Sequence, residues 1–80
     1  MNELAQALAK ANQIVQEEAI KRELLKELLA ILHAIIPGFI LPGFGAVNEL
    51  DEEWADQRTD AECDQFASET IAECEARDPG

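Results

Sequence analysis

The sequence has few residues of the kinds that active sites use. Its 80 residues include one histidine, two cysteines, one serine and no tyrosine. No base lies near Ser68, no lysine follows the glycines as it does in a phosphate-binding loop, and no Asp-x-Asp-x-Asp-Gly calcium pattern occurs. His33, Cys63 and Cys74 lack the short paired spacing of zinc ligands. We therefore expect no enzymatic activity, no cofactor and no metal site.

Two cysteines are too few for a disulfide framework. On one helix Cys63 and Cys74 would share a face but lie about 16 Å apart, and a disulfide requires Cα atoms within about 7 Å. We expect both to be small buried side chains in a reducing compartment. Antiparallel pairing of two copies, with bridges between them, is the alternative. Because no basic stretch precedes an apolar core at the N-terminus, we expect a cytoplasmic location.

Cations are also scarce. Six Lys and Arg residues stand against 17 Asp and Glu residues, so the net charge is −11. Residues 1–40 hold five acids and four bases, whereas residues 41–80 hold twelve acids and two bases. Such a chain repels nucleic acid backbones. It favours a partner with a basic surface, including one that otherwise binds nucleic acid, although an acidic surface can also serve only to keep a protein in solution.

Glycine and proline are absent from the first 36 residues, which are rich in strong helix formers. With Asn2 as N-cap and Pro37-Gly38 as a stop signal, we predict one long amphipathic helix over residues 1–36. Alternate steps of four and three residues connect ten positions, eight of them apolar. The wide apolar stripe favours a helical bundle or coiled coil, and the predicted oligomer seam consists of Leu4, Leu8, Val15, Leu25, Leu29, Leu32 and Ile36.

The seam is interrupted by Glu18 and Arg22, which are spaced i,i+4 in the favourable order. They either form a polar layer that sets the register or mark where the helix leaves the seam for solvent. His33 lies at the edge of the seam, where we expect its ring to hydrogen-bond a carbonyl group or water. Because the long helix would span roughly 50 Å and the later helices are too short to cover it, we expect a homo-oligomer.

Residues 28–47 form a run without a formal charge, interrupted by two Pro-Gly-Phe triplets. Since Pro-Gly pairs favour turns, we predict an apolar loop over residues 37–47. It could be a buried crossover, an exposed anchor for a partner through Phe39, Ile40, Leu41 and Phe44, or a segment in lipid. The membrane alternative places the N-terminus inside, because the bases precede the run, but two Pro-Gly pairs would break the span.

The acidic C-terminal half predicts two shorter helices. Asn48 is a plausible N-cap for a helix within residues 48–58 that carries Trp54, and the dipole of this helix favours the acids in its first turn: Glu49, Asp51, Glu52 and Glu53. Thr59 and Glu62 match a capping box, which predicts a second helix over residues 59–77. Its apolar stripe comprises Cys63, Phe66, Ala67, Thr70, Ile71 and Cys74.

These patterns predict an all-α single domain over residues 1–80, with a long helix, an apolar turn and two acidic helices that pack back. The expected function is non-enzymatic: a small acidic protein that binds a larger protein, and inhibits or occupies its surface, as accessory proteins of phages and bacteria do. The expected partner contacts are the four acids at 49 and 51–53 with Trp54 and the apolar loop. A membrane-embedded subunit or pore-forming protein, with residues 28–47 in the bilayer, is the alternative.

Overall fold

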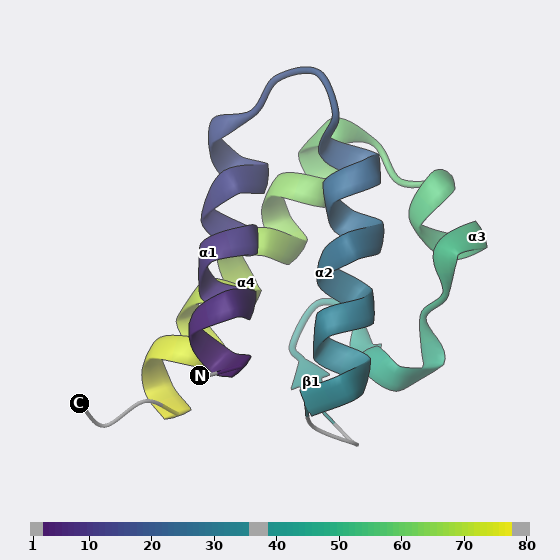
Figure 1. Cartoon of the computed structure of the whole chain (residues 1–80). Coiled ribbons are helices and arrows are strands. Elements are labelled where there is room, and N and C mark those ends of the chain that lie inside the picture. The colour runs from purple at the N-terminus through teal and green to yellow at the C-terminus, as the bar shows by residue number, and fades with distance from the viewer. Residues whose placement is uncertain (1–2, 36–38, 78–80) are drawn as a thin grey trace.

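Figure 1 shows the computed structural model of the chain, which describes residues 3–35 and 39–77. The described elements are α1 (Glu3–Gln16), α2 (Lys21–Ile35), β1 (Ile40–Leu41), β2 (Gly45–Ala46), the 3-10 helix η1 (Val47–Glu49), α3 (Glu52–Asp56) and α4 (Asp60–Arg77). The fold extends 32, 25 and 22 Å along its three principal axes. The predicted helical fold is confirmed at this level, with a small antiparallel strand pair in addition.

The prediction of one helix over residues 1–36 is wrong. Helix α1 ends at Gln16 and α2 begins at Lys21, and the two lie antiparallel beside each other (Figure 1). The fold-back buries Ala7, Ala11 and Ile14 of α1 against the rest of the chain, and such packing outweighs local helix propensity. The N-cap predicted at Asn2, the stop at Pro37-Gly38 and the last seam position, Ile36, lie outside the described residues.

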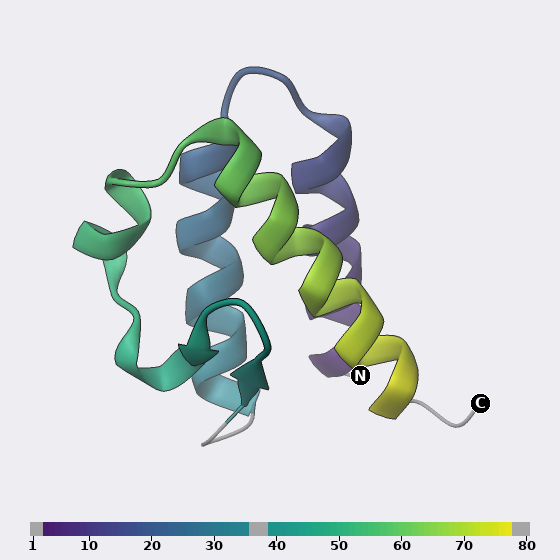
Figure 2. The same cartoon turned by 180° about the vertical axis from the view of Figure 1, so that it is seen from behind.

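Helix α4 packs on both α1 and α2 and closes the core from behind (Figure 2). The predicted stripe is confirmed, since five of its residues are buried and Ile71 is half-buried. The hydroxyl of buried Thr70 donates to the carbonyl of Phe66 at 2.8 Å, so it brings no unsatisfied group into the core. At the N-terminus of α4, Thr59 and Glu62 exchange the two hydrogen bonds that the capping-box pattern predicts.

The segment predicted as a loop over residues 37–47 contains a short hairpin. Ile40 pairs with Ala46 and Leu41 with Gly45, whose φ of 81° is the left-handed conformation that glycine adopts most readily. The amide of Gly43 donates to Glu69 Oε1 at 2.8 Å, which joins the tip of the hairpin to α4. A Cβ atom at Gly43 would lie 2.6 Å from Glu69 Oε2, so a larger residue there would require the end of the flexible Glu69 side chain to shift.

The helix predicted within residues 48–58 is shorter than expected and begins later. Residues 47–49 form the 3-10 helix η1, the chain is extended at Leu50, and α3 covers only Glu52–Asp56. Its N-cap is Asp51, whose carboxylate accepts from the amide of Trp54 at 2.8 Å, and not the predicted Asn48. Asp is among the strongest N-cap residues because its oxygen satisfies an otherwise free amide of the first turn.

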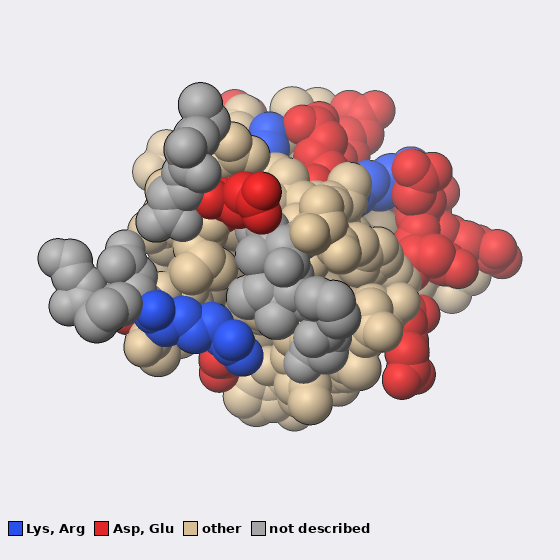
Figure 3. Space-filling view, turned by 60° about the horizontal axis from the view of Figure 1, so that its bottom comes forward, with Lys and Arg blue, Asp and Glu red and all other residues tan. Residues whose placement is uncertain are grey.

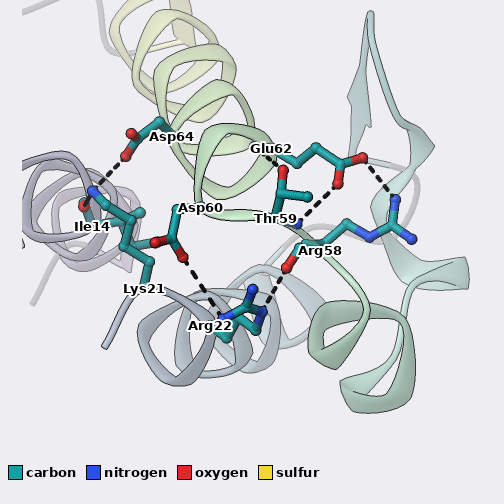
Figure 4. A network of polar contacts seen from close by, with 8 residues as sticks. All are labelled: Ile14, Lys21, Arg22, Arg58, Thr59, Asp60, Glu62 and Asp64. Carbon is teal, nitrogen blue, oxygen red and sulfur yellow. Dashed lines mark hydrogen bonds and ion pairs between the residues drawn. The ribbon is translucent and has the colours of Figure 1, made fainter. Parts of the chain in front are cut away.

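A buried ammonium group ties the α1–α2 turn to α4 (Figure 4). Lys21 is only 7 % exposed, and its Nζ donates to the carbonyl of Ile14 at 2.7 Å and to Asp64 Oδ1 at 2.6 Å. The lysine therefore contacts the end of α1 and the first turns of α4 from the first position of α2. Because a buried charge without such partners costs several kcal/mol, this arrangement fixes the geometry of the turn.

A second contact joins the start of α2 to the junction between α3 and α4 (Figure 4). Arg22 Nε donates to the carbonyl of Arg58, and its guanidinium lies 3.7 Å from Asp60 Oδ1. Arg58 in turn pairs with Glu62 at 3.1 Å. The two helix junctions thus lie next to each other in one network of polar contacts.

Candidate functional site

The six cationic side chains of the chain are each paired with a carboxylate. The N–O distances of these pairs range from 2.5 to 3.7 Å. The pairs are Lys10–Glu27, Lys21–Asp64, Arg22–Asp60, Lys26–Asp56, Arg58–Glu62 and Arg77–Glu73. Every positive charge outside the chain termini is therefore engaged within the fold.

Many acids remain without such a partner. Residues 3–35 and 39–77 contain 16 of the 17 Asp and Glu residues, and subtracting the six paired ones leaves ten with no cation within 4 Å among these residues. They are Glu3, Glu17, Glu18, Glu23, Glu49, Asp51, Glu52, Glu53, Glu69 and Glu75. The net negative charge is thus carried by side chains that a basic partner can still neutralise.

Four of these unpaired acids lie on η1 and at the start of α3, and we call Glu49, Asp51, Glu52 and Glu53 the α3 acids. All four are exposed. Figure 3 shows carboxylates crowded along the right-hand edge of the molecule, the side on which α3 lies in Figure 1. Asp51 also caps α3, so its carboxylate has a structural role that the other three do not share.

The acidic surface extends from α3 to the adjacent part of α2. Lys26 lies between the two helices, with its Nζ 2.5 Å from Asp56 Oδ1. The hydrogen bond and charge of Asp56, together with the charges of Glu52 and Glu23, raise the pKa of the Lys26 ammonium. One lysine is thus surrounded by carboxylates from two helices, and the local balance remains negative.

A cleft of about 200 Å³ lies between α2 and the start of α3. Its lining combines an apolar part with charged groups: Lys26, Leu29, Ala30, His33, Asp51 and Glu52. His33 Nε2 lies 2.8 Å from the carbonyl oxygen of Val47, and since a carbonyl only accepts, this nitrogen carries the hydrogen. The predicted bond from His33 to a carbonyl is therefore confirmed, and it joins α2 to η1.

The apolar residues predicted to contact a partner have different surroundings. Phe39 and Leu41 are buried in the core, so their side chains present no surface in this structure. Ile40 is 59 % exposed. Phe44 and Trp54 are half-buried, and their rings meet edge to face with centroids 5.8 Å apart. Only the last three residues present apolar surface to the outside.

Most of the predicted oligomer seam belongs to the core of the single chain. Leu25, Leu29 and Leu32 are buried, and Leu4 and Leu8 are half-buried against the core. Val15 is 45 % exposed. In this structure the leucines of α2 therefore contact the chain's own helices, because the fold-back supplies the packing partner that the prediction assigned to a second copy.

Both cysteines are buried, and their thiols are free. Burial raises the pKa of Cys63 and of Cys74, so the reactive thiolate is less populated than in an exposed cysteine.

In the described parts of the chain, no three His, Cys, Asp or Glu side chains are grouped so that they could hold a metal ion. The same residues contain no helix with the length and apolar character to cross a membrane.

Sequence reasoning missed the contributions of Lys26, Asp56 and Glu23 to this surface. Asp56 follows Glu52 by four residues and so shares its helix face, a signal that could have been used. The position of α2 beside α3 has no comparable local signal.

No protein-family model, curated protein or solved structure matches the chain.

Proposed function

We propose that this chain is a small non-enzymatic protein that binds a basic surface of a larger protein and so occupies or inhibits that surface. The observation that carries the proposal is the charge distribution: all six cationic side chains are paired, whereas ten acids have no cationic partner among the residues that the structure describes. A surface of this kind attracts a positively charged partner over several ångströms and accelerates the encounter. The same field opposes direct binding to nucleic acid.

The α3 acids are the proposed centre of contact. They lie next to Trp54, whose half-buried ring contacts that of Phe44, and beside the cleft between α2 and α3. Interfaces draw much of their affinity from aromatic side chains surrounded by polar groups. In this proposal the carboxylates select a basic partner, and the aromatic surface together with the cleft provides the apolar contact.

The test compares three forms of the chain as bait in a lysate of its source organism. The first is wild type, the second is Glu49→Gln, Glu52→Gln and Glu53→Gln, and the third is Glu3→Gln, Glu17→Gln and Glu75→Gln. Both variants lose three unpaired charges, but only the first set lies around α3, and Asp51 is left intact because it caps the helix. Bound proteins are quantified by mass spectrometry and then titrated individually by calorimetry at two salt concentrations.

The proposal predicts a protein with a basic surface that binds wild type and the control variant but binds the α3 variant at least about tenfold more weakly, a difference that narrows at high salt. Equal binding to all three forms would show that the α3 acids do not recognise the partner. If Phe44→Ala abolished binding and the α3 variant did not, the aromatic surface would be the contact with the partner.

Homo-oligomer formation is a separate part of the proposal. The buried seam gives it no support, because the leucines of α2 are already covered within one chain. The turn between α1 and α2 supports it in a different form, in which two copies exchange α1. The membrane alternative places residues 28–47 in the bilayer. The described part of this run includes the end of α2, the β1–β2 hairpin and the start of η1. Its Phe39 and Leu41 are buried in the core.

A further inference from the structure

The turn between α1 and α2 contains none of the residues that usually end a helix. Residues 17–20 read Glu-Glu-Ala-Ile, without glycine, proline or asparagine. No non-glycine residue in the described chain has a positive φ, so the turn also lacks the left-handed residue that commonly terminates helices. Glu and Ala are strong helix formers. The local sequence therefore favours continuation of the helix through a segment where the structure turns back.

Helical hydrogen bonding approaches the turn from both sides. The amide of Glu17 donates to the carbonyl of Gln13 at 2.9 Å, and the amide of Leu24 donates to the carbonyl of Ile20 at 3.0 Å. Between them, the amides of residues 18–23 make no i→i−4 bond in the described chain. A continuous helix would provide each of these six amides with such a partner.

The antiparallel pair of α1 and α2, which we call the helical hairpin, has one interaction that a continuous helix would replace. The carbonyl of Ile14, which would accept from the amide of Glu18 in a continuous helix, accepts instead from Lys21 Nζ at 2.7 Å. By contrast, the pair between Lys21 and Asp64 joins α2 to α4 and can persist in either form. The Lys21–Ile14 bond is therefore specific to the folded-back turn.

Two exposed apolar side chains flank this turn. Val15 is 45 % exposed and Ile20 is 42 % exposed, and with Ile40 they are the large hydrophobic residues exposed in the described chain. After the polar positions Glu18 and Arg22, the four-and-three spacing of apolar positions that includes Leu8 and Val15 resumes at Leu25 and Leu29 in the same register. The pattern thus suits a straight helix as well as it suits the hairpin.

We propose that residues 17–20 are a hinge, and that two copies of the chain exchange α1 to form a dimer. In this dimer α1 and α2 of each copy form one continuous helix over residues 3–35. Helix α1 of one copy then packs on α2 and α4 of the other, through the same apolar side-chain contacts of Ala7, Ala11 and Ile14 that it makes within one chain, whereas the carbonyl of Ile14 bonds within its own long helix.

The exchange preserves the existing interface and adds a new one. Because α1 and α2 are antiparallel in the hairpin, the two long helices of the dimer are also antiparallel, with their hinges side by side at the twofold axis. In each long helix Val15 and Ile20 lie on either side of this axis and about 140° apart around the helix, so at most one of them faces the partner's hinge. The monomer is favoured at low concentration, because association reduces the freedom of two chains, and the dimer is favoured at high concentration.

Light scattering after size exclusion, from about 1 µM to about 1 mM protein, measures the dimer dissociation constant. Lys21→Met removes the hairpin-specific bond and is expected to lower this constant about tenfold or more. Lys10→Met is the matched control: it removes the Lys10–Glu27 pair between α1 and α2, which both forms contain, and leaves the constant unchanged. Circular dichroism verifies that both variants remain helical.

Glycine substitutions test the hinge from the opposite direction. Ala19→Gly weakens only the continuous helix and is expected to raise the dissociation constant about thirtyfold, since each dimer contains two such glycines. Ala9→Gly is the control, because exposed Ala9 is helical in both forms and its replacement leaves the constant unchanged. An equal effect of the two glycines would contradict the hinge.

The exchange itself is tested on wild-type protein by a zero-length carbodiimide cross-link. Lys10 Nζ lies 2.8 Å from Glu27 Oε1, within the reach of this reagent. Isotopically heavy and light chains are refolded together at about 1 mM, and cross-linked peptides of the dimer fraction are analysed by mass spectrometry. Exchange of α1 predicts that about half of the Lys10–Glu27 links join a heavy to a light chain.

Two results would overturn the proposal. One is a dimer whose Lys10–Glu27 links join only chains of the same isotope, because the copies then associate without exchanging α1. The other is a chain that stays monomeric at about 1 mM both as wild type and as Lys21→Met, because the hinge then does not open under conditions that favour it.

Discussion

The two helix junctions that lie side by side in Figure 4 are stabilised in different ways. Before α4, Thr59 and Glu62 exchange two hydrogen bonds of 2.9 and 3.1 Å within one helical turn. Between α1 and α2, no such local pair is present among the described contacts. Instead, Lys21 reaches the carbonyl of Ile14 and the carboxylate of Asp64, which is 43 residues away in sequence.

The difference shows which interactions determine where α4 begins and where α1 ends. The start of α4 is encoded by residues that are neighbours in the chain, so it persists wherever the segment is helical. The end of α1 is determined by what the helix packs against, because its own sequence favours continuation. Changes that disrupt tertiary packing should therefore affect the turn between α1 and α2 far more than the start of α4.

The largest effect is expected for Ile14→Ala, because Ile14 is the last buried residue of α1 before the turn. Loss of this side chain should lower the free energy of unfolding by about 3 kcal/mol, measured by urea denaturation at low protein concentration. Val15→Ala is the control, since Val15 is half-exposed and its truncation should cost less than about 1 kcal/mol. Similar losses for both variants would mean that packing of α1 does not stabilise the turn.

Lys21→Met should lower the free energy of unfolding of the monomer by about 2 kcal/mol. It leaves the carbonyl of Ile14 without its charged donor and Asp64 without its cation. Lys10→Met removes an ion pair whose carboxylate is largely exposed and should cost less than about 1 kcal/mol in the same denaturation experiment. If the two lysines contribute equally, burial of Lys21 has no special role in the turn.

Thr59→Ala should lower the free energy of unfolding by about 1 kcal/mol, the usual cost of losing an N-cap, whereas Thr59→Ser should preserve it. The hydrogen bonds from Thr59 hold the pKa of Glu62 below its usual value of 4.5. Their contribution is therefore present above pH 4.5 and is lost as the pH falls through the lowered pKa. Because the larger cause is the backbone amide of Thr59, which Thr59→Ala keeps, NMR titration should show a pKa of Glu62 below 4.5 in wild type and only a partial rise in the variant. A wild-type value at or above 4.5 would argue against the capping box.

The smallest effect is expected for the two thiols, which report on local opening. Burial raises the pKa of Cys63, near the Thr59 junction, and of Cys74, near the end of α4. At pH 8 both should therefore react with iodoacetamide at least about tenfold more slowly than in urea-unfolded chain. If Lys21→Met accelerates Cys63 but not Cys74, opening is confined to the region of the turn. Equal acceleration would indicate that the whole chain unfolds.

The sequence was most informative where the structure depends on neighbours in the chain. The capping box at Thr59, the apolar stripe of α4 and the carbonyl contact of His33 all rest on short-range spacing, and the structure contains each of them. The α3 N-cap was misassigned by three residues, because Asn48 and Asp51 are both good N-caps and local preference does not separate them.

The sequence was least informative where a distant segment decides the outcome. A continuous helix and a hairpin leave the same apolar pattern in residues 1–36, so the break at residues 17–20 could not be predicted without the position of Asp64 on α4. Likewise, the pattern of Phe39 and Leu41 suits a buried crossover and an exposed anchor equally well. Only the packing of the β1–β2 hairpin against the helices distinguishes a buried crossover from an exposed anchor.

Amide hydrogen exchange, followed by NMR on monomeric protein at low concentration, tests most directly whether α1 and α2 are separate helices held together by distant contacts. The structure predicts slow exchange at Glu17 and Leu24, which have i→i−4 partners, and fast exchange at residues 18–23 between them. The amide of Cys63, which donates to the carbonyl of Thr59 at 2.9 Å, should exchange slowly. Uniformly slow exchange from Glu17 to Leu24 in the monomer would contradict the account, because it would mean that the helix continues through the turn.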